Sequence, residues 1–342
     1  MSPVVIALSL VVSVFLTRHL CNPKSRLYVL DHPNRRSLHD QPMPRGGGIA
    51  ILAAILISGT IAAGVYGVSI DIAWLGAAAL LIAGISFLDD RLTIGLGYRI
   101  VIHFAAAGLL VWSGFGLGSI DLPGTTWILS QPVTVVLSLL FIAWMVNLYN
   151  FMDGMDGFAG GMAVIGFSTF AVLGWLADVQ LFMVFNLVVA AAAGGFLFFN
   201  FPPARIFMGD TGSSLLGFLA AAFMLWADRD GIFPLWIGIL VFSPFIVDAT
   251  VTLFRRMLRG EKVWQAHKIH YYQRLVQLGW GHKRTVLSEY VLMLLCALSA
   301  VTARYLVPSA QWLLIVAWLL AYGVLVFAVH RLEGRQGIVM TR

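Results

Sequence analysis

Long apolar stretches alternate with short polar segments along most of the chain. A stretch of about 17–25 apolar residues can cross a hydrocarbon core about 30 Å thick. Such a segment is expected to be a helix, because lipid offers no water to satisfy exposed backbone groups. The pattern predicts membrane-spanning helices at residues 2–17, 47–66, 70–88, 100–117, 132–149, 158–176, 180–199, 212–227, 233–254, 286–306 and 310–330. We therefore expect an all-α integral membrane protein with ten or eleven transmembrane helices, forming one domain over residues 1–342.

The composition agrees with a lipid environment. The 342 residues are 60% hydrophobic and 11% charged, with a mean hydropathy of +0.88. A soluble domain carries roughly 25% charged residues, so an ordinary soluble protein is excluded by the apolar surface that this chain would have. The two cysteines, Cys21 and Cys296, form neither a CxxC pair nor a metal-binding spacing. We interpret both as packing residues.

The distribution of basic residues predicts the orientation in the membrane. If the first helix enters from outside, the cytoplasmic segments are 18–46, 89–99, 150–157, 200–211, 255–285 and 331–342. Of the 22 Lys and Arg residues, all except Arg229 and Arg304 then lie in these segments, as the positive-inside rule requires. We expect the N-terminus outside and the C-terminus in the cytoplasm. The net charge of +6 follows from basic residues at the membrane surface and implies no nucleic-acid partner.

Two polar clusters come early on the predicted cytoplasmic side. In the first loop, basic residues including Arg45 precede the run Gly46–Gly48, whose backbone amides could bind an anion. An ordinary basic loop with a helix-entry turn is the alternative. The adjacent pair Asp89 and Asp90 follows the third apolar stretch. Adjacent carboxylates repel unless a cation relieves them, so the pair suits a base or a metal ligand, and a solvated helix end is the alternative.

Two further clusters combine Asn, Asp and Gly. The segment 147–161 carries Asn147, Asn150, Asp153 and Asp156 among four glycines where a helix leaves the membrane. Oxygen ligands of this kind suit a hard cation such as Mg²⁺. The segment 200–214 contains Asn200, Phe207 and Asp210. A simple helix N-cap would also explain an Asp at position 210.

The last polar cluster is the long loop 255–285. It is rich in cationic and hydrogen-bonding side chains, namely Arg255, Arg256, Arg259, Lys262, His267, Lys268, His270, Arg274, His282, Lys283 and Arg284. This density could hold a pyrophosphate, and anchoring to the membrane surface is the alternative. Together the five clusters supply the metal ligands, cations and base that phosphoryl transfer requires.

The motifs in these clusters resemble those of the polyprenyl-phosphate N-acetylhexosamine-1-phosphate transferase family. In chain order they are Pro-Asn-Arg-Arg-Ser with Pro-Arg-Gly-Gly-Gly, Phe-Leu-Asp-Asp, Asn-Phe-Met-Asp-Gly-Met-Asp-Gly, and Phe-Met-Gly-Asp-Thr-Gly-Ser. The resemblance runs from Asp31 to about Arg274. It implies that a UDP-N-acetylhexosamine gives its sugar-1-phosphate to a polyprenyl phosphate, which yields polyprenyl-diphosphate-sugar and UMP.

The resemblance also implies roles for individual residues. Asp210 and Asn150 would bind Mg²⁺, for which Mn²⁺ could substitute, and Asp89 would deprotonate the lipid phosphate. The other expected catalytic residues are Asp90, Asp153, His267 and His270. The expected substrate-binding residues are Arg45, Asn147, Asp156, Asn200, Phe207, Lys268 and Arg274.

The last loop departs from a run of adjacent histidines that some branches of the family carry. It reads His267-Lys268-Ile269-His270 instead, which looks more like the branch that initiates O-antigen and other surface polysaccharides than the peptidoglycan-precursor branch. The donor stays open among UDP-GlcNAc, UDP-FucNAc and UDP-QuiNAc. The resemblance further implies undecaprenyl phosphate as acceptor, a bacterial inner membrane with the site on its cytoplasmic face, and a homodimer.

Two mechanisms and two rival functions stay open at this point. The lipid phosphate could attack the β-phosphate of the donor directly, or a carboxylate could first form a phosphosugar-enzyme intermediate. A transporter is the main rival, but its polar groups would lie near the bilayer midplane, often within internal repeats. A lipid-binding scaffold is the other rival, and it would leave the Asn/Asp/Gly motifs without a purpose.

Overall fold

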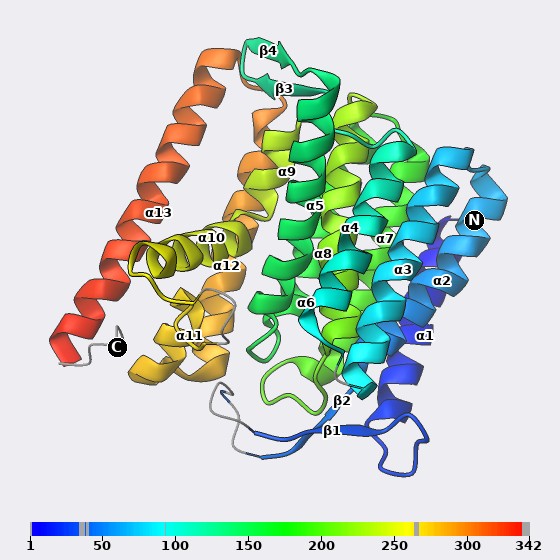
Figure 1. Ribbon diagram of the computed structural model, residues 1–342, viewed down its shortest axis with the longest axis vertical. Helices are drawn as coiled ribbons and strands as arrows, with labels where there is room; N and C mark the ends of the chain where they lie inside the picture. The colour runs from blue at the N-terminus through cyan, green and yellow to red at the C-terminus, as the bar shows by residue number, and fades with distance from the viewer. Residues whose placement is uncertain (1, 34–37, 39–40, 93, 263–266, 337–342) are drawn as a thin grey trace.

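A computed structural model describes residues 2–33, 38, 41–92, 94–262 and 267–336 of this protein. The described residues form a bundle of long helices (Figure 1). The helices are α1 Ser2–Leu20, α2 Gly47–Tyr66, α3 Ile70–Leu92, α4 Leu96–Trp112, α5 Gln131–Met152, α6 Phe158–Leu176, α7 Gln180–Asn200, α8 Asp210–Arg229, α9 Leu235–Val241, α10 Ser243–Leu258, α11 Tyr271–Leu275, α12 Gly281–Ala303 and α13 Pro308–Gln336. In these residues nine helices are long and apolar enough to cross a membrane, or ten with one bent pair. The predicted all-α, multi-pass membrane fold is confirmed.

The ninth predicted span is wrong in shape. The stretch 233–254 is predicted as one spanning helix, but the structure divides it into α9 and α10, which meet at an angle of 84°. Pro244 lies in the first turn of α10. Proline has no backbone N–H and clashes with the preceding turn, so a helix cannot run straight through it. Hydropathy alone did not reveal this break, because both halves are apolar.

Helix α8 is the centre of the bundle. Nearly all of its residues are buried, and it packs against α2, α3 and α5. This position explains its low hydropathy for a spanning helix, because protein rather than lipid surrounds it. Helix α13 is the opposite case: few of its residues are buried, and it stands at the edge of the molecule (Figure 1).

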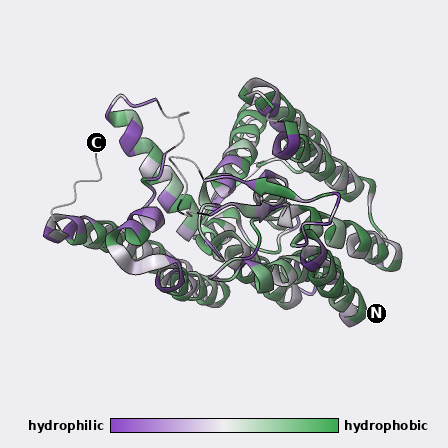
Figure 2. Ribbon diagram, turned by 90° about the horizontal axis from the view of Figure 1, so that it is seen from below, coloured by the Kyte–Doolittle hydropathy of each residue, from purple (hydrophilic) through white to green (hydrophobic). Residues whose placement is uncertain are grey.

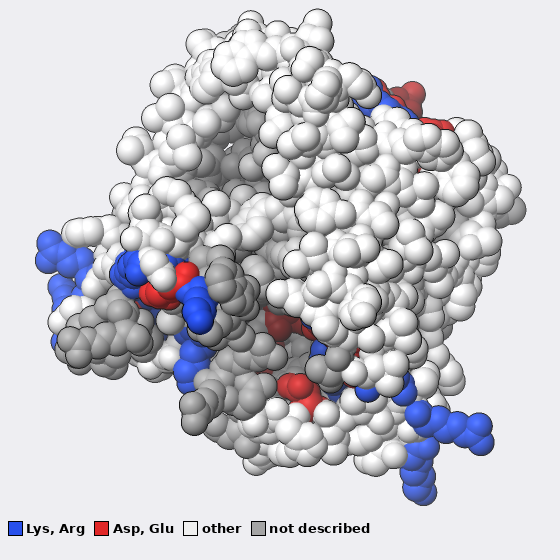
Figure 3. Space-filling view, viewed as in Figure 1, with Lys and Arg blue, Asp and Glu red and all other residues white. Residues whose placement is uncertain are grey.

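The loops with the polar clusters gather at one end of the bundle. Strand β1 Val29–Asp31 pairs there with β2 Met43–Arg45, and α11 lies at the same end (Figure 1). The opposite end carries the hairpin of β3 Ser119–Leu122 and β4 Thr125–Ile128. Seen from the β1–β2 end, the ribbons of the bundle are mostly hydrophobic (Figure 2). Acidic side chains lie in a recess at this end, with basic ones around it (Figure 3).

The two arginines that the orientation prediction placed outside both have partners. Arg229 lies 2.5 Å from Asp71 and stacks over Phe115. Arg304 donates to the backbone oxygen of Leu176, at the last residue of α6, where a cation complements the helix dipole. Their positions are therefore explained by local contacts at the end opposite β1 and β2.

The glycine run after β2 packs backbone against backbone. The amides of Gly46 and Gly47 donate to the carbonyl oxygen of Phe207, and the amide of Gly48 donates to that of Met208. A Cβ added at Gly48 would lie 2.2 Å from the backbone nitrogen of Gly212. The predicted anion-binding role of these amides is therefore wrong, because the loop before α8 occupies them. The run instead fixes the start of α2 against the start of α8.

Candidate active site

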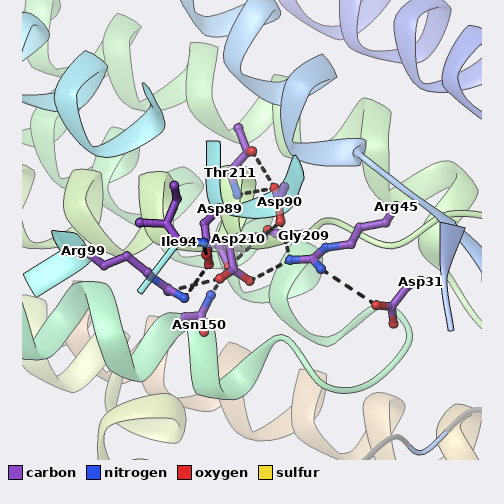
Figure 4. Close-up of polar contacts among 11 residues, drawn as sticks. Asp31, Arg45, Asp89, Asp90, Ile94, Arg99, Asn150, Gly209, Asp210 and Thr211 are labelled. Atoms are coloured by element: carbon purple, nitrogen blue, oxygen red, sulfur yellow. Dashed lines mark hydrogen bonds and ion pairs between the residues drawn. The ribbon is translucent and has the colours of Figure 1, made fainter. Parts of the chain in front are cut away.

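Four helices of the bundle bring their ends together around Asp210, the first residue of α8 (Figure 4). Asp89 and Asp90 lie in the last turn of α3, and Arg99 in the first turn of α4. Asn150 lies in the last turn of α5. Asn150 and Asp210 are far in sequence from Asp89 and Arg99, and the packing of α3 and α5 against α8, and of α4 against α3 and α5, makes these residues neighbours.

Asp210 lies between two arginines. One carboxylate oxygen is 3.1 Å from Arg45 of β2, and the other is 3.0 Å from Arg99. The amide group of Asn150 also contacts this carboxylate, and it donates to the hydroxyl of Ser213 at 3.0 Å. The structure thus places the two residues predicted to bind a metal, Asn150 and Asp210, side by side.

Asp89 shares an arginine with Asp210. Its carboxylate lies 2.5 Å from Arg99 and accepts the backbone N–H of Ile94 at 2.7 Å. Sequence reasoning missed Arg99, because a single basic residue at the start of an apolar helix has no motif around it. The signal that could have identified Arg99 is its short separation from the Asp pair, ten residues after Asp89.

Asp90 holds the N-terminus of α8. Its carboxylate accepts the backbone amides of Asp210 and Thr211, both at 2.9 Å, and the Thr211 hydroxyl at 2.6 Å. It also pairs with Arg45. Free amides at a helix start need acceptors, and here a neighbouring helix supplies them. The contacts of Asp90 fix the position of Asp210, and a catalytic role for Asp90 stays a prediction.

We expect Asp90→Ala to destabilise the protein by about 1–3 kcal/mol, because two helix-start amides and one arginine lose their acceptor. The thermal unfolding temperature in detergent measures this loss. Asp121→Ala removes a carboxylate from the hairpin at the opposite end and serves as the matched control. Equal unfolding temperatures for the two variants would show that Asp90 does not fix α8.

Acidic side chains outnumber basic ones in this cluster. Among the described residues of the cluster, and with every acid counted as ionised, Asp31, Asp89, Asp90, Asp153 and Asp210 give five negative charges and Arg45 and Arg99 give two positive charges, so the formal sum is −3. Burial raises the pKa of Asp153 well above its ordinary value, and the neighbouring charge of Asp210 raises it further. Such a cluster is relieved by a cation that binds among the carboxylates.

The oxygen atoms of this cluster suit Mg²⁺. In the described part of the chain, no group of three or more His, Cys, Asp or Glu side chains is placed to hold a metal ion. Mg²⁺ does not require such a group, since it usually takes one or two carboxylates and completes its coordination with water and substrate phosphates. Asp210 and Asn150 provide one carboxylate and one amide, with Asp89 and Asp153 nearby. The residues present therefore fit the ion.

The last loop packs against the central Asn/Asp/Gly motif. The hydroxyl of Tyr272 donates to the backbone oxygen of Phe151 at 3.1 Å, and a Cβ at Gly154 would lie 2.3 Å from that hydroxyl. The ring of His270 stacks on Phe151 and lies 4.7 Å from the ring of His267. The two histidines predicted to be catalytic are therefore next to each other, beside the central motif. Burial, with positive charge nearby, lowers the pKa of His267 to about 3.

Asp248, for which the sequence suggested no role, caps α11. Its carboxylate accepts the backbone amides of Tyr271 and Tyr272 at 2.9 and 3.0 Å, and it lies 3.2 Å from the ring of His270. This repeats the device of Asp90, in which a helix supplies the acceptor for the start of another. Asp248 therefore orients the histidine loop.

Two residues predicted to bind substrate, Asn200 and Asp156, make contacts between the loops. The buried Asn200 accepts the amide of Gly157 and donates to the carbonyl of Ile206, both at 2.9 Å. Asp156 accepts the amide of Ala204 at 3.0 Å and lies 3.1 Å from His282. These contacts join the central motif to the loop before α8.

Two further residues predicted to bind substrate have partners within the protein. Arg274 is buried, and its guanidinium pairs with Glu333 of α13. Asn147 donates to the backbone oxygen of Ala143 in its own helix. The side chain of Lys268 is exposed, and Phe207 is half-buried beside Arg45. Arg35 and Arg36 lie outside the described residues.

Most of the acid cluster, from Asp89 to Asp210, falls inside a segment that matches a known family. Residues 72–228 match the model of glycosyl transferase family 4. The chain is 33% identical over 288 residues to a probable undecaprenyl-phosphate N-acetylglucosaminyl 1-phosphate transferase of Bacillus subtilis, covering 82% of this chain and 78% of the relative. The chain belongs to the polyprenyl-phosphate N-acetylhexosamine-1-phosphate transferase family.

Other members of the family have different names. A decaprenyl-phosphate N-acetylglucosaminephosphotransferase of Mycobacterium leprae is 30% identical over 315 residues, which cover 83% of this chain and 79% of the relative. A phospho-N-acetylmuramoyl-pentapeptide-transferase of Shouchella clausii is 28% identical over 271 residues, covering 75% of this chain and 82% of the relative. Membership thus confirms the predicted enzyme family, a family of phosphosugar transferases, but covers more than one named activity.

The segment that matches the family model contains the metal-binding candidates and ends before the histidine loop. Asp89, Arg99, Asn150 and Asp210 all lie within residues 72–228. The loop that contains His267 and His270 lies beyond this range. The family model therefore covers the metal-binding candidates but not Asp31, Arg45 or the histidine loop.

Proposed function

We propose that this transferase moves an N-acetylhexosamine-1-phosphate from a UDP-sugar to undecaprenyl phosphate in a bacterial inner membrane, with Mg²⁺ at Asp210. The excess of carboxylates around Asp210 is the observation that carries the proposal. The carboxylates around Asp210 repel a donor diphosphate, and a cation between them relieves this repulsion. Phosphoryl-transfer sites use Mg²⁺ for this purpose.

The residues divide the work of the reaction between them. When bound by Asp210 and Asn150, the ion would neutralise charge on the donor diphosphate. Arg99 bridges Asp89 and Asp210, so its guanidinium is placed to hold the acceptor phosphate next to Asp89. Asp89 is our choice for the group that takes the proton of that phosphate. Arg45 lies on the side of Asp210 that faces away from Arg99.

We favour a single displacement. An oxygen of the lipid phosphate attacks the β-phosphorus of the UDP-sugar, a new P–O bond forms, and the bond to the α-phosphate breaks to release UMP. The bond at the anomeric carbon stays intact, so the anomeric configuration is kept. The contacts support this route, because both oxygens of Asp89 already accept hydrogen bonds or pair with Arg99. A raised pKa keeps Asp153 protonated to higher pH than a free carboxyl, which makes it a poorer nucleophile.

We place the site on the cytoplasmic face and the product in surface-polysaccharide synthesis. The basic loops at the β1–β2 end support the orientation through the positive-inside rule. UDP-GlcNAc is the first donor to test, since relatives at 30–33% identity are named for N-acetylglucosamine. UDP-FucNAc and UDP-QuiNAc are further candidates, and the peptidoglycan-precursor activity of the 28% identical relative is the alternative.

We expect the purified protein in detergent to release UMP only when undecaprenyl phosphate, Mg²⁺ and a suitable UDP-sugar are all present. A coupled UMP assay measures this with a panel of the three UDP-N-acetylhexosamines and UDP-N-acetylmuramoyl-pentapeptide. Removing Mg²⁺ with a chelator should stop release, and Mn²⁺ should restore part of it. Release that is indifferent to chelator or to lipid contradicts the proposal. No release with any donor from folded protein favours a transporter.

A further inference from the structure

Three buried polar side chains form a layer one helical turn deeper than the acid cluster. Ser86 precedes Asp90 by four residues on α3, His103 follows Arg99 by four on α4, and Ser214 follows Asp210 by four on α8. Residues four apart in a helix share a face. Each member of the layer therefore lies beneath one residue of the candidate active site. No motif in the sequence drew attention to any of them.

The layer is buried and lacks protein partners. Ser86 and Ser214 are 0% exposed and His103 is 2% exposed. Among the described residues, neither ring nitrogen of His103 and neither serine hydroxyl has a hydrogen-bond partner. The Nε of Arg99 is also buried and has no hydrogen-bond partner among these residues. Leaving a buried polar group unsatisfied costs about 1–3 kcal/mol, so four groups together point to a polar occupant.

We infer that this layer binds ordered water and that His103 positions Arg99 through it. Buried waters typically make about three hydrogen bonds to otherwise unsatisfied polar groups. The groups here are complementary: Arg99 Nε–H donates, a neutral imidazole donates from one nitrogen and accepts at the other, and each hydroxyl does both. His103 lies one helical turn below Arg99 on the same face of α4.

The layer controls the orientation of the guanidinium that the transfer reaction uses. The two terminal nitrogens of Arg99 pair with Asp89 and Asp210. Only Nε is left to hold the guanidinium plane in place from the side of the polar layer. A water that joins Nε to His103 would hold this plane while a phosphate replaces one of the carboxylates. His103 is then a positioning residue for acceptor binding. This inference rests on the proposed function, in which Arg99 holds the acceptor phosphate.

We expect His103→Leu, which fills similar space without polar atoms, to lower kcat/KM for undecaprenyl phosphate by about tenfold or more. Losses of this size are typical of residues that orient a metal ligand through a hydrogen bond. The change should appear mainly in KM for the lipid, and KM for the UDP-sugar should stay within about twofold. His103→Gln keeps a donor and an acceptor and should recover most of the loss. Ser214→Ala should show a smaller effect of the same kind.

Ser58→Ala is the matched control. Ser58 is also a buried hydroxyl without a partner in the described part of the chain, but it lies on α2 about 15 Å beyond Gly48. This variant should leave both KM values unchanged. Thermal unfolding of each variant separates a loss of folded protein from a change in binding.

The outcomes distinguish this inference from the proposed function. If wild-type protein releases no UMP, the proposed function fails before His103 is tested. If wild-type protein is active but His103→Leu keeps the wild-type KM for lipid, the inference is overturned. It is also overturned if lipid and donor KM rise equally, or if His103→Gln is as impaired as His103→Leu, because a packing role would give those results.

Discussion

Asp210→Asn is expected to stop sugar-phosphate transfer while the protein still folds. We expect turnover to fall by at least about a thousandfold, at the upper end of what the loss of one preorganised charged contact costs an enzyme. The carboxylate contacts both Arg45 and Arg99 and is the main metal-binding candidate. Asparagine has the same shape, and Asp90 binds the backbone amide of residue 210 rather than its side chain. The start of α8 should therefore keep its position.

Two measurements check this expectation. UMP release reports turnover, and the shift of the thermal unfolding temperature on adding Mg²⁺ reports metal binding, because a ligand that binds only folded protein stabilises it. Wild type should show the shift and Asp210→Asn should not. Asp121→Asn changes a carboxylate at the opposite end and should behave as wild type. An Asp210→Asn protein with normal turnover would refute the proposed metal site.

Gly48→Ala is expected to yield little or no folded protein. The added methyl group would lie 2.2 Å from the nitrogen and 2.6 Å from the Cα of Gly212. Both atoms belong to the backbone of α8, so neither can rotate away as a side chain would. Close crossings of membrane helices depend on such small residues. The start of α8, with Asp210, would have to move for the methyl group to fit.

Gly64→Ala is the matched control for this substitution. It adds the same methyl group to the same helix, α2, at a place where nothing lies within 4 Å. The amount of monodisperse protein after detergent extraction and its unfolding temperature measure the result. If Gly48→Ala equals Gly64→Ala in both, the contact between α2 and α8 is looser in the membrane than the structure indicates.

The hydropathy pattern by itself determined the class of protein and most of its helices. This succeeded because the cost of placing polar groups in lipid depends mainly on the local sequence. The motifs around Asp89, Asn150 and Asp210 also identified the family and the chemistry that the site residues suit. Each motif is a short run of residues, so its signal does not depend on how the helices pack.

Only the tertiary structure decided which polar residues meet and what each one contacts. Arg99 and His103 carry no motif, and they matter because α4 packs beside α3 near the start of α8. Nothing in the sequence distinguishes Asp90 and Asp248 from other acidic residues. In the structure, each accepts the first backbone amides of another helix. Arg274, predicted to bind substrate, pairs with Glu333, which lies 59 residues further along the chain. Contacts between residues so far apart in the chain depend on helix packing in three dimensions, which no local pattern records.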